Sequence, residues 1–194
     1  MEELRRKILE NGLGIGTDIV KVDMFLNHRI DTALTFRMGE AWAEEFRGEE
    51  PTLVLTVEAS GIALALAAAH ALGDLPVVFA KKAATAVQRD ELVQAPVYSF
   101  THKTQNTIRV DRHYLPEGSR VLIIDDFLAD GEAVRGMISL CEQQGATVVG
   151  VGIAVEKGFQ DGGKKLREQG IHLKSLAVVE GIEEGRILLR PEDD

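Results

Sequence analysis

The sequence predicts an α/β fold built on a doubly wound, mainly parallel sheet. Apolar, β-branched runs alternate with helix-length segments, as they do in strand–helix–strand units. These runs are continuous and do not alternate with polar residues, which is typical of strands buried on both faces. The length of 194 residues suits one sizeable core and is short for two. We therefore expect a single domain over 1–194.

The first half of the chain contains three helix patterns and two strand-like runs. Asp31 is a suitable N-cap for the second helix, and Gly48 is its expected stop. The segment "GLGIG" at 12–16 follows a helix and is predicted to be a turn. In chain order we expect a helix at 2–10, a helix at 31–48, a buried strand at 52–57, a helix at 62–72 and a second buried strand at 75–80.

The second half repeats this alternation after one irregular insertion. The insertion is polar and contains the short strand-like runs "PVYSF" and "NTIRV", so we expect a hairpin arm or flexible flap over about 84–110. Beyond it we expect a strand at 121–125, a helix at 131–144 ended by Gly145, a strand at 146–156, and strand-like runs at 171–179 and 185–190.

Composition narrows the class of protein. The net charge of −9 argues against a general nucleic-acid binder, because phosphate neutralisation calls for a basic face. No apolar run is long enough to cross a bilayer, and "MEELRRKILENG" lacks the apolar core of a signal peptide, so we expect a cytoplasmic protein without a membrane partner. Cys141, the single cysteine, lies on the apolar side of a predicted helix and is interpreted as core packing.

One stretch of the acidic chain is locally basic. This stretch could collect a small anionic ligand, or it could be a solvated loop face. Between 81 and 112 its basic residues are Lys81, Lys82, Arg89, Lys103, Arg109 and Arg112, and its acidic residues are Asp90, Glu91 and Asp111.

The stretch "VLIIDDFLADGEA" at 121–133 carries the strongest chemical signal. A buried strand ends in Asp125 and Asp126, and a short loop then leads through a glycine into a helix. A helix N-terminus with unpaired N–H groups can cradle a phosphate, and paired carboxylates can accept from ribose hydroxyls or from water on Mg²⁺. The alternative is a plain strand end followed by a turn. Neither a Walker loop nor a GxGxxG motif follows any predicted strand.

This stretch resembles the sugar-diphosphate signature of the type I phosphoribosyltransferases. The resemblance extends over nearly the whole chain and is closest to members that act on xanthine. The other matching segments are "KVDMFLNHRID", "TVEASGIALA", "LPVVFAKK", "PVYSFTHKTQ" and "GIAVEKGFQ". The resemblance implies transfer of phosphoribose from phosphoribosyl pyrophosphate to xanthine, a homodimer, and a small hood built from about 1–30 and 157–194.

The resemblance also implies a role for each matching residue. Asp125, Asp126 and Lys81 would be catalytic, with the aspartates on the ribose hydroxyls and Lys81 on the pyrophosphate. Mg²⁺ would enter with the sugar diphosphate and not occupy a separate protein metal site. The 5-phosphate would lie on Ala129, Asp130, Gly131, Glu132 and Ala133, the pyrophosphate on Glu58, Ala59, Ser60 and Gly61, and the purine on Val20, Asn27 and Lys157.

Physical chemistry makes these roles reasonable. Breaking the bond from C1 to pyrophosphate places positive charge on the sugar and negative charge on the leaving group, so carboxylates and cations are needed on opposite sides. Lys157 can donate to a purine carbonyl, and Asn27 can both donate and accept. A flap that excludes water would protect the activated sugar from hydrolysis. A snorkelling Lys157 and an N-capping Asn27 are the corresponding structural alternatives.

Two positions depart from the family pattern. Asp130 stands where Thr, Ser or Asn is usual, and its carboxylate would repel a phosphate, so we expect it to turn away and cap the following helix. Val20 stands where leucine is expected. Three other functions remain open: a hypoxanthine or guanine transferase, a regulator that senses the sugar diphosphate and binds nucleic acid, and a nucleotide-binding domain without transferase activity.

Overall fold

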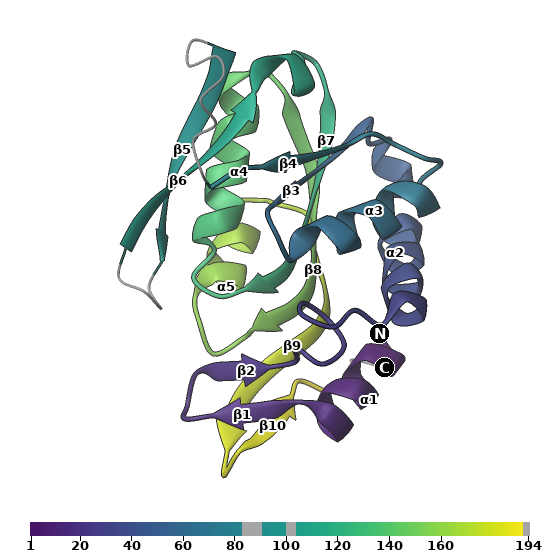
Figure 1. Cartoon of the computed structure of the whole chain (residues 1–194), viewed down its shortest axis with the longest axis vertical. Coiled ribbons are helices and arrows are strands. Elements are labelled where there is room, and N and C mark those ends of the chain that lie inside the picture. Colours follow the sequence, from purple (N-terminus) through teal and green to yellow (C-terminus); the bar gives the residue numbers. More distant parts are fainter. Residues whose placement is uncertain (83–90, 100–103, 192–194) are drawn as a thin grey trace.

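The fold is a six-stranded sheet with helices on both faces and a separate hairpin against one of them (Figure 1). The computed structural model describes residues 1–82, 91–99 and 104–191. Its helices are α1 (Glu2–Asn11), α2 (Thr32–Phe46), α3 (Gly61–Ala71), α4 (Glu132–Gln143) and α5 (Gly162–Glu168), with short 3-10 turns at Arg47–Glu49 and Arg112–Tyr114. Its strands are β1 (Leu13–Ile15), β2 (Ile19–Lys21), β3 (Leu53–Val57), β4 (Val77–Ala80), β5 (Leu92–Ser99), β6 (Thr104–Asp111), β7 (Arg120–Leu128), β8 (Thr147–Lys157), β9 (Leu173–Glu183) and β10 (Arg186–Leu189).

The main sheet confirms the predicted class. Its order is β10-β9-β8-β7-β3-β4, and every neighbouring pair is parallel except the antiparallel β9 and β10. The continuous apolar runs of β3 and β7 lie at its centre, which explains why they do not alternate with polar residues. The carboxyl ends of β3, β7 and β8 therefore meet along one edge, where ligands bind in open sheets of this kind.

Alternate residues of β7 belong to two different hydrophobic cores. Leu122 and Ile124 pack with α1, α2 and α3 on one face, whereas Val121 and Ile123 pack with α4 and the β5–β6 hairpin on the other. Cys141 belongs to the second core, where burial raises the pKa of its thiol to about 12. The thiol is therefore a packing group, as predicted, because a reactive cysteine needs a lowered pKa.

Aromatic residues of α2 fit against glycines of β8. A Cβ on Gly150 would lie 2.4 Å from the Phe46 ring, and a Cβ on Gly152 would lie 2.8 Å from Trp42. Both rings are completely buried, and burying one such side chain contributes about 1.5–3 kcal/mol. Asp31 starts α2 as predicted, with its carboxylate accepting from Leu34 N at 3.1 Å.

Three expectations about local structure are corrected. The segment "GLGIG" does not form a plain turn, because Leu13–Ile15 pairs as a strand with Ile19–Lys21. The strand Val77–Ala80 is not buried on both faces, since it forms the edge of the sheet and Phe79 is 39% exposed. The helix α5 has no counterpart in the sequence prediction, because its two leading glycines are poor helix formers.

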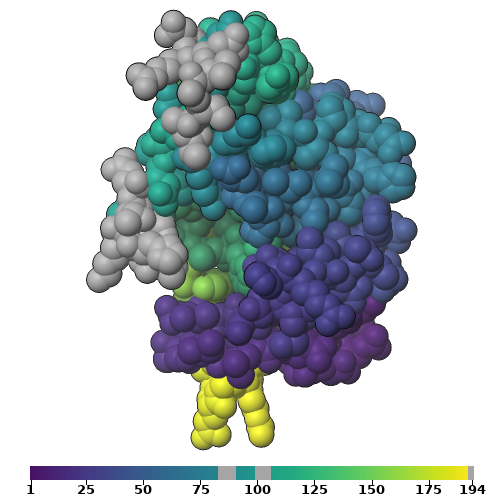
Figure 2. Space-filling model, in the orientation of Figure 1, coloured from purple at the N-terminus to yellow at the C-terminus, as the bar shows by residue number. Residues whose placement is uncertain are grey.

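The N-terminal and C-terminal segments meet at one end of the molecule. The Met1 amino group donates to Leu176 O at 2.8 Å, and Gly14 N donates to Gly185 O at 3.0 Å. Figure 2 shows the N-terminal residues, in purple, across this end, with the yellow β9–β10 hairpin projecting below them. No helix among the described residues is long and apolar enough to span a membrane.

Candidate active site

A cavity of about 800 Å³ opens at the carboxyl ends of β3, β7 and β8. It contains most of the residues singled out from the sequence. The predicted residues that line it are Val20, Glu58, Ser60, Asp125, Asp126, Ala129, Asp130, Gly131, Glu132, Ala133 and Lys157. The predicted residues that do not line it are Asn27, Ala59, Gly61 and Lys81.

The two aspartates lie within β7, which does not end at 125 as predicted but continues to Leu128, and they occupy different environments. Asp125 is only 4% exposed, and its Oδ1 accepts from Asp126 N at 3.0 Å. Burial, together with the neighbouring charge of Asp126, raises the pKa of Asp125 well above its usual value. Asp126 accepts from Phe127 N at 3.0 Å and from the side-chain amide of Asn27 at 2.8 Å. A neutral Asp125 can donate a hydrogen bond, so the pair can both donate to and accept from adjacent hydroxyls.

The loop before α4 has the form of an anion cradle. Gly131 is the N-cap of α4, and its φ of +83° is a left-handed conformation that glycine adopts without strain. Its carbonyl accepts from Arg135 N at 2.9 Å, which starts the regular turns of the helix. The N–H groups of the first turn have no partner within the helix and can bind a phosphate.

The expectation for Asp130 is corrected at this loop. Its side chain does not cap α4, because Gly131 holds the N-cap position and no side chain bonds there. The backbone carbonyl of Asp130 accepts from the Arg135 guanidinium at 2.7 Å, and Arg135 also pairs with Glu132. The Asp130 carboxylate lies near Lys157, where it acts to raise the pKa of the lysine.

The turn between β3 and α3 lies beside Asp125. A Cβ on Gly61 would lie 2.0 Å from Thr56 Oγ1 and 3.0 Å from Asp125 Oδ1, so only glycine fits there. Lys82 N donates to Glu58 Oε1 at 2.6 Å, which joins this turn to the end of β4.

Of the two adjacent lysines, Lys82 lines the cavity and Lys81 does not. The backbone of Lys81 pairs with Arg109, and its ammonium lies 5.9 Å from the centre of the Phe79 ring. The sequence pattern singled out Lys81 and missed Lys82, because neighbouring residues at a strand end point in different directions.

The far end of the cavity combines apolar and polar groups from distant segments. Val20 is buried in β2, and Lys157 ends β8 with its ammonium donating to Asp18 O at 2.7 Å. Burial lowers the pKa of Lys157, although Asp18 and Asp130 act in the opposite direction. Gln160, which the sequence reasoning missed, also lines the cavity, and the turn that carries it is closed by Gln160 N donating to Lys157 O at 2.9 Å.

The part of the predicted flap that the structure describes is a hairpin that forms one wall of the cavity, while 84–90 and 100–103 lie outside the described residues. Its strands β5 and β6 pair in regular antiparallel register. The hairpin packs on α4, where a Cβ on Gly136 would lie 2.6 Å from Val97 and 3.0 Å from Ile108. Val97 and Ile108 both line the cavity, together with Tyr98 and Asn106.

The basic stretch contributes little charge to the cavity itself. The Arg109 guanidinium donates to Lys82 O at 2.9 Å, to Thr107 O at 3.0 Å and to the Gln94 side chain at 3.1 Å. Arg109 therefore fastens the base of the hairpin. The predicted charges of Arg89, Asp90 and Lys103 lie outside the described residues.

The charge of the lining bears on whether a metal ion fits here. Among the described residues that line the cavity, the cations are Lys82 and Lys157. A sugar diphosphate would be repelled by such a lining unless cations came with it, so the residues fit a divalent ion carried by the ligand. The carboxyl groups are those of Asp18, Glu58, Asp125, Asp126, Asp130 and Glu132.

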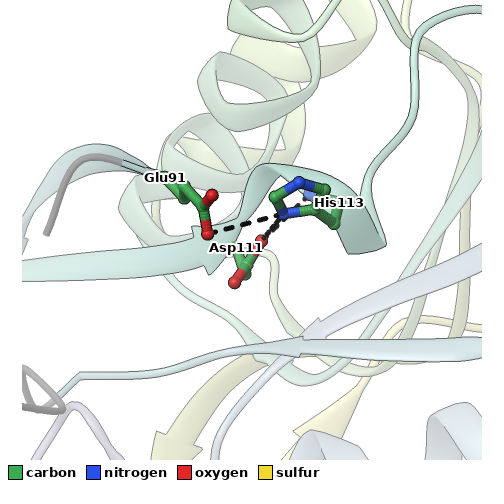
Figure 3. A group of neighbouring side chains, drawn as sticks. All are labelled: Glu91, Asp111 and His113. Atoms are coloured by element: carbon green, nitrogen blue, oxygen red, sulfur yellow. Dashed lines mark hydrogen bonds and ion pairs between the residues drawn. The ribbon is translucent and has the colours of Figure 1, made fainter. Parts of the chain in front are cut away.

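Among the described residues, one group of side chains that could ligate a metal lies outside the cavity, at the base of the hairpin (Figure 3). The His113 Nδ1 lies 2.8 Å from Asp111 Oδ1 and 3.8 Å from Glu91 Oε2. Asp111 Oδ1 also accepts from His113 N at 3.0 Å, so both potential ligand atoms already take part in hydrogen bonds. We therefore interpret the cluster as a structural contact that joins the start of β5 to the end of β6.

Comparison with known proteins agrees with this geometry. A family model described as the phosphoribosyl transferase domain matches residues 29–172. The xanthine phosphoribosyltransferase of Bifidobacterium longum subsp. infantis is 50% identical over 192 residues, which cover 98% of this chain and all of that protein. The xanthine phosphoribosyltransferase of Bacillus mycoides is 47% identical over 187 residues, covering 96% of this chain and 94% of that protein.

Solved structures of the same fold include adenine phosphoribosyltransferases. The enzyme from Rhodothermus marinus superposes with a TM-score of 0.72 at 25% identity, covering 92% of this chain and 97% of that one. The enzyme from Thermoanaerobacter pseudethanolicus superposes with a TM-score of 0.66 at 26% identity, covering 76% of this chain and 81% of that one.

Proposed function

The chain belongs to the phosphoribosyl transferase family, and from that premise we propose that it joins xanthine to 5-phosphoribosyl 1-pyrophosphate, giving xanthosine 5′-monophosphate and pyrophosphate. Such an enzyme serves purine salvage. The observation that favours an oxygen-bearing purine over adenine is Lys157, a half-buried ammonium at the end of β8 inside the cavity. The choice of xanthine draws support from relatives named xanthine phosphoribosyltransferase, which are about half identical over nearly the full chain.

Lys157 favours a base with a carbonyl over a base with an amine. An ammonium only donates, so it pairs with the oxygen at C6 or C2 of xanthine and opposes the amine at C6 of adenine. Partial burial strengthens this preference, because an unpaired donor away from water costs about 1–3 kcal/mol. In this proposal Val20 packs on the flat face of the purine, and Asn27 spans the base and sugar ends through its bond to Asp126.

The sugar phosphate would lie across the ends of β7 and α4. The N–H groups of Ala129, Asp130, Gly131, Glu132 and Ala133 would take the 5-phosphate, and Asp125 and Asp126 would take the ribose hydroxyls. As the bond at C1 breaks, the carboxyl pair favours the positive charge that develops on the ring. No protein nucleophile is required, because N9 of the purine attacks C1 directly.

The pyrophosphate would lie on the turn formed by Glu58, Ala59, Ser60 and Gly61, with Lys81 and Lys82 nearby. Magnesium bound to the diphosphate would neutralise the charge of the leaving group. The role of the protein here is to offer backbone N–H groups and a lysine and to keep the diphosphate in line with C1. The acidic lining supports a ligand that brings its own cation.

The other parts of the chain support this reaction in simple ways. We propose one catalytic domain, with a hood from about 1–30 and 157–194 over the base and a flap over about 84–110 that excludes water. The bonds between the two chain ends support the hood, and the cavity-facing residues of the β5–β6 hairpin support the flap.

We also propose a cytoplasmic homodimer. A hollow of about 450 Å³ between α2 and α3, lined in part by the 51% exposed Phe36, combines apolar residues with Glu40, Glu44 and Arg47 and offers a surface for a second copy. Size-exclusion chromatography with light scattering tests this part. A mass of about 21 kDa at every concentration would contradict the dimer.

The experiment that tests the function uses each base in turn. The protein is incubated with phosphoribosyl pyrophosphate, MgCl₂ and xanthine, guanine, hypoxanthine or adenine, and nucleotide and pyrophosphate are measured by chromatography. We expect xanthine to have the highest kcat/KM and adenine to give no product. Product from hypoxanthine but not from xanthine would contradict the proposed specificity for xanthine. If no base gave product, the remaining alternatives would be a regulator that senses the sugar diphosphate and a nucleotide-binding domain without transferase activity.

A further inference from the structure

We propose that Gly162, the first residue of α5, is a positioning residue that sets the backbone of the phosphate loop. The inference rests on the proposed function. Gly162 N donates to Ala129 O at 3.2 Å, so α5 begins in direct contact with the loop. A Cβ on Gly162 would lie 2.1 Å from Ala129 O, 2.7 Å from Asp130 C and 2.7 Å from Gly131 N.

All three of these atoms belong to the backbone of the loop. Real Cβ atoms do not approach other atoms this closely, and a backbone atom cannot swing aside as the end of a long side chain can. Any side chain at 162 must therefore displace either the loop or α5. Gly131 shows the same close approach from the other side, since a Cβ there would lie 3.4 Å from the α-carbon of Gly162.

An ion pair between the buried Glu156 and the partly exposed Arg167 holds α5 in place. The Glu156 side chain, 4% exposed, accepts from the two terminal nitrogens of Arg167 at 2.7 Å each, and Ser175 also donates to it. A Cβ on Gly163 would lie 2.0 Å from Glu156 Oε1, so the helix backbone rests on this carboxylate. The helix is held against the end of β8 on one side and meets the loop on the other.

The same segment also carries the lysine of the base site. Glu156 precedes Lys157 in β8, and the turn to α5 is closed by Gln160 N donating to Lys157 O at 2.9 Å. The positions of the base lysine and of the 5-phosphate cradle therefore depend on one fixed piece of structure. Displacing the contact at Gly162 should move the cradle and leave Lys157 in place, because the lysine lies on the anchored side.

The test is the variant Gly162→Ala, compared with Gly181→Ala. Gly181 lies in β9, and a Cβ there would meet nothing within 4 Å, so the control adds the same methyl without a clash. We expect Gly162→Ala to raise the KM for phosphoribosyl pyrophosphate at least tenfold while the KM for the base changes less than threefold. Gly181→Ala should change neither constant.

A binding measurement separates this inference from the proposed function. Calorimetry with ribose 5-phosphate reports on the cradle without any base or turnover. Binding to the wild type that weakens at least tenfold in Gly162→Ala supports the positioning role, whereas equal binding by both proteins overturns it. If the wild type binds ribose 5-phosphate but forms no nucleotide, the proposed function fails and the positioning role is still decided by the comparison.

A second variant covers the case in which Gly162→Ala does not fold. Glu156→Gln keeps the shape of the side chain and removes half of the ion pair with Arg167, which loosens α5. We expect weaker binding of ribose 5-phosphate in a protein with the same circular dichroism spectrum as the wild type. Unchanged binding in folded Glu156→Gln would overturn the inference.

Discussion

The carboxyl group of Asp125 should make the stability of the folded protein depend on pH. Burial raises the pKa of this group above its value in the unfolded chain, and the neighbouring Asp126 adds to the effect. The folded state therefore holds a proton at a pH where the unfolded state has released it. Stability from this source is complete below the unfolded pKa of about 4 and is lost as the pH rises towards the folded pKa.

The variant Asp125→Asn removes this dependence with little change in shape. The asparagine oxygen can still accept from Asp126 N, which lies 3.0 Å from Asp125 Oδ1 in the wild type. One proton of difference corresponds to about 1.4 kcal/mol per pH unit. Relative to the wild type, the free energy of unfolding of the variant should therefore rise by about that amount per unit between pH 4 and the folded pKa.

Urea unfolding at a series of pH values measures this slope directly. Protein concentration must be held constant, because subunit association would add to the apparent stability. Asp126→Asn is the comparison variant, since it leaves the Asp125 carboxyl in place and removes the neighbouring charge that adds to its raised pKa, so a weaker pH dependence should remain. Parallel pH curves for the wild type and Asp125→Asn would refute the reasoning, because they would mean that Asp125 is charged in the folded protein at no cost.

Three further substitutions test the site and the fold. Lys157→Met keeps the side-chain length but removes the donor, so kcat/KM for xanthine should fall about 10- to 100-fold, the effect of losing a hydrogen bond to a charged group, with a small change in the KM for the sugar diphosphate. Asp130→Asn removes a carboxylate from the phosphate loop and should lower the KM for phosphoribosyl pyrophosphate severalfold in steady-state kinetics; a higher KM would show that the charge helps binding. Asp31→Ala deletes the N-cap bond to Leu34 N and should lower the free energy of unfolding by about 1 kcal/mol in urea titrations, without changing kcat/KM.

The sequence predicted the central part of the fold because that part is determined by local pattern. Continuous apolar runs followed by glycine-containing turns are read correctly as buried strands leading into helices, as at Leu53–Val57 and Arg120–Leu128. The edge strand Val77–Ala80 has an equally apolar sequence, and only its place in the sheet exposes it. Strand order is a property of the whole chain, so no local pattern could have revealed this difference.

The site was predictable where a motif fixes several residues together. The run from Asp125 to Ala133 lies on one strand, loop and helix, so its members necessarily share one site. Lys82 and Gln160 were missed because each reaches the cavity through a turn whose direction the sequence does not specify. The contact at Gly162 was also hidden, since it joins segments more than thirty residues apart through backbone atoms that carry no sequence signature.

The position of Asp130 links the two ends of the cavity. Its carboxylate does not cap α4. A negative side chain beside a negatively charged phosphate would also not strengthen phosphate binding at the helix N-terminus. Its electrostatic partner is Lys157, whose pKa burial lowers while Asp18 and Asp130 raise it. A lysine that loses its proton can no longer serve as a donor-only group, and the preference for an oxygen-bearing base would then weaken. In this arrangement the charge of Asp130 would oppose a phosphate in the loop but favours the charged form of Lys157, which gives a physical reason for an acidic residue at this position.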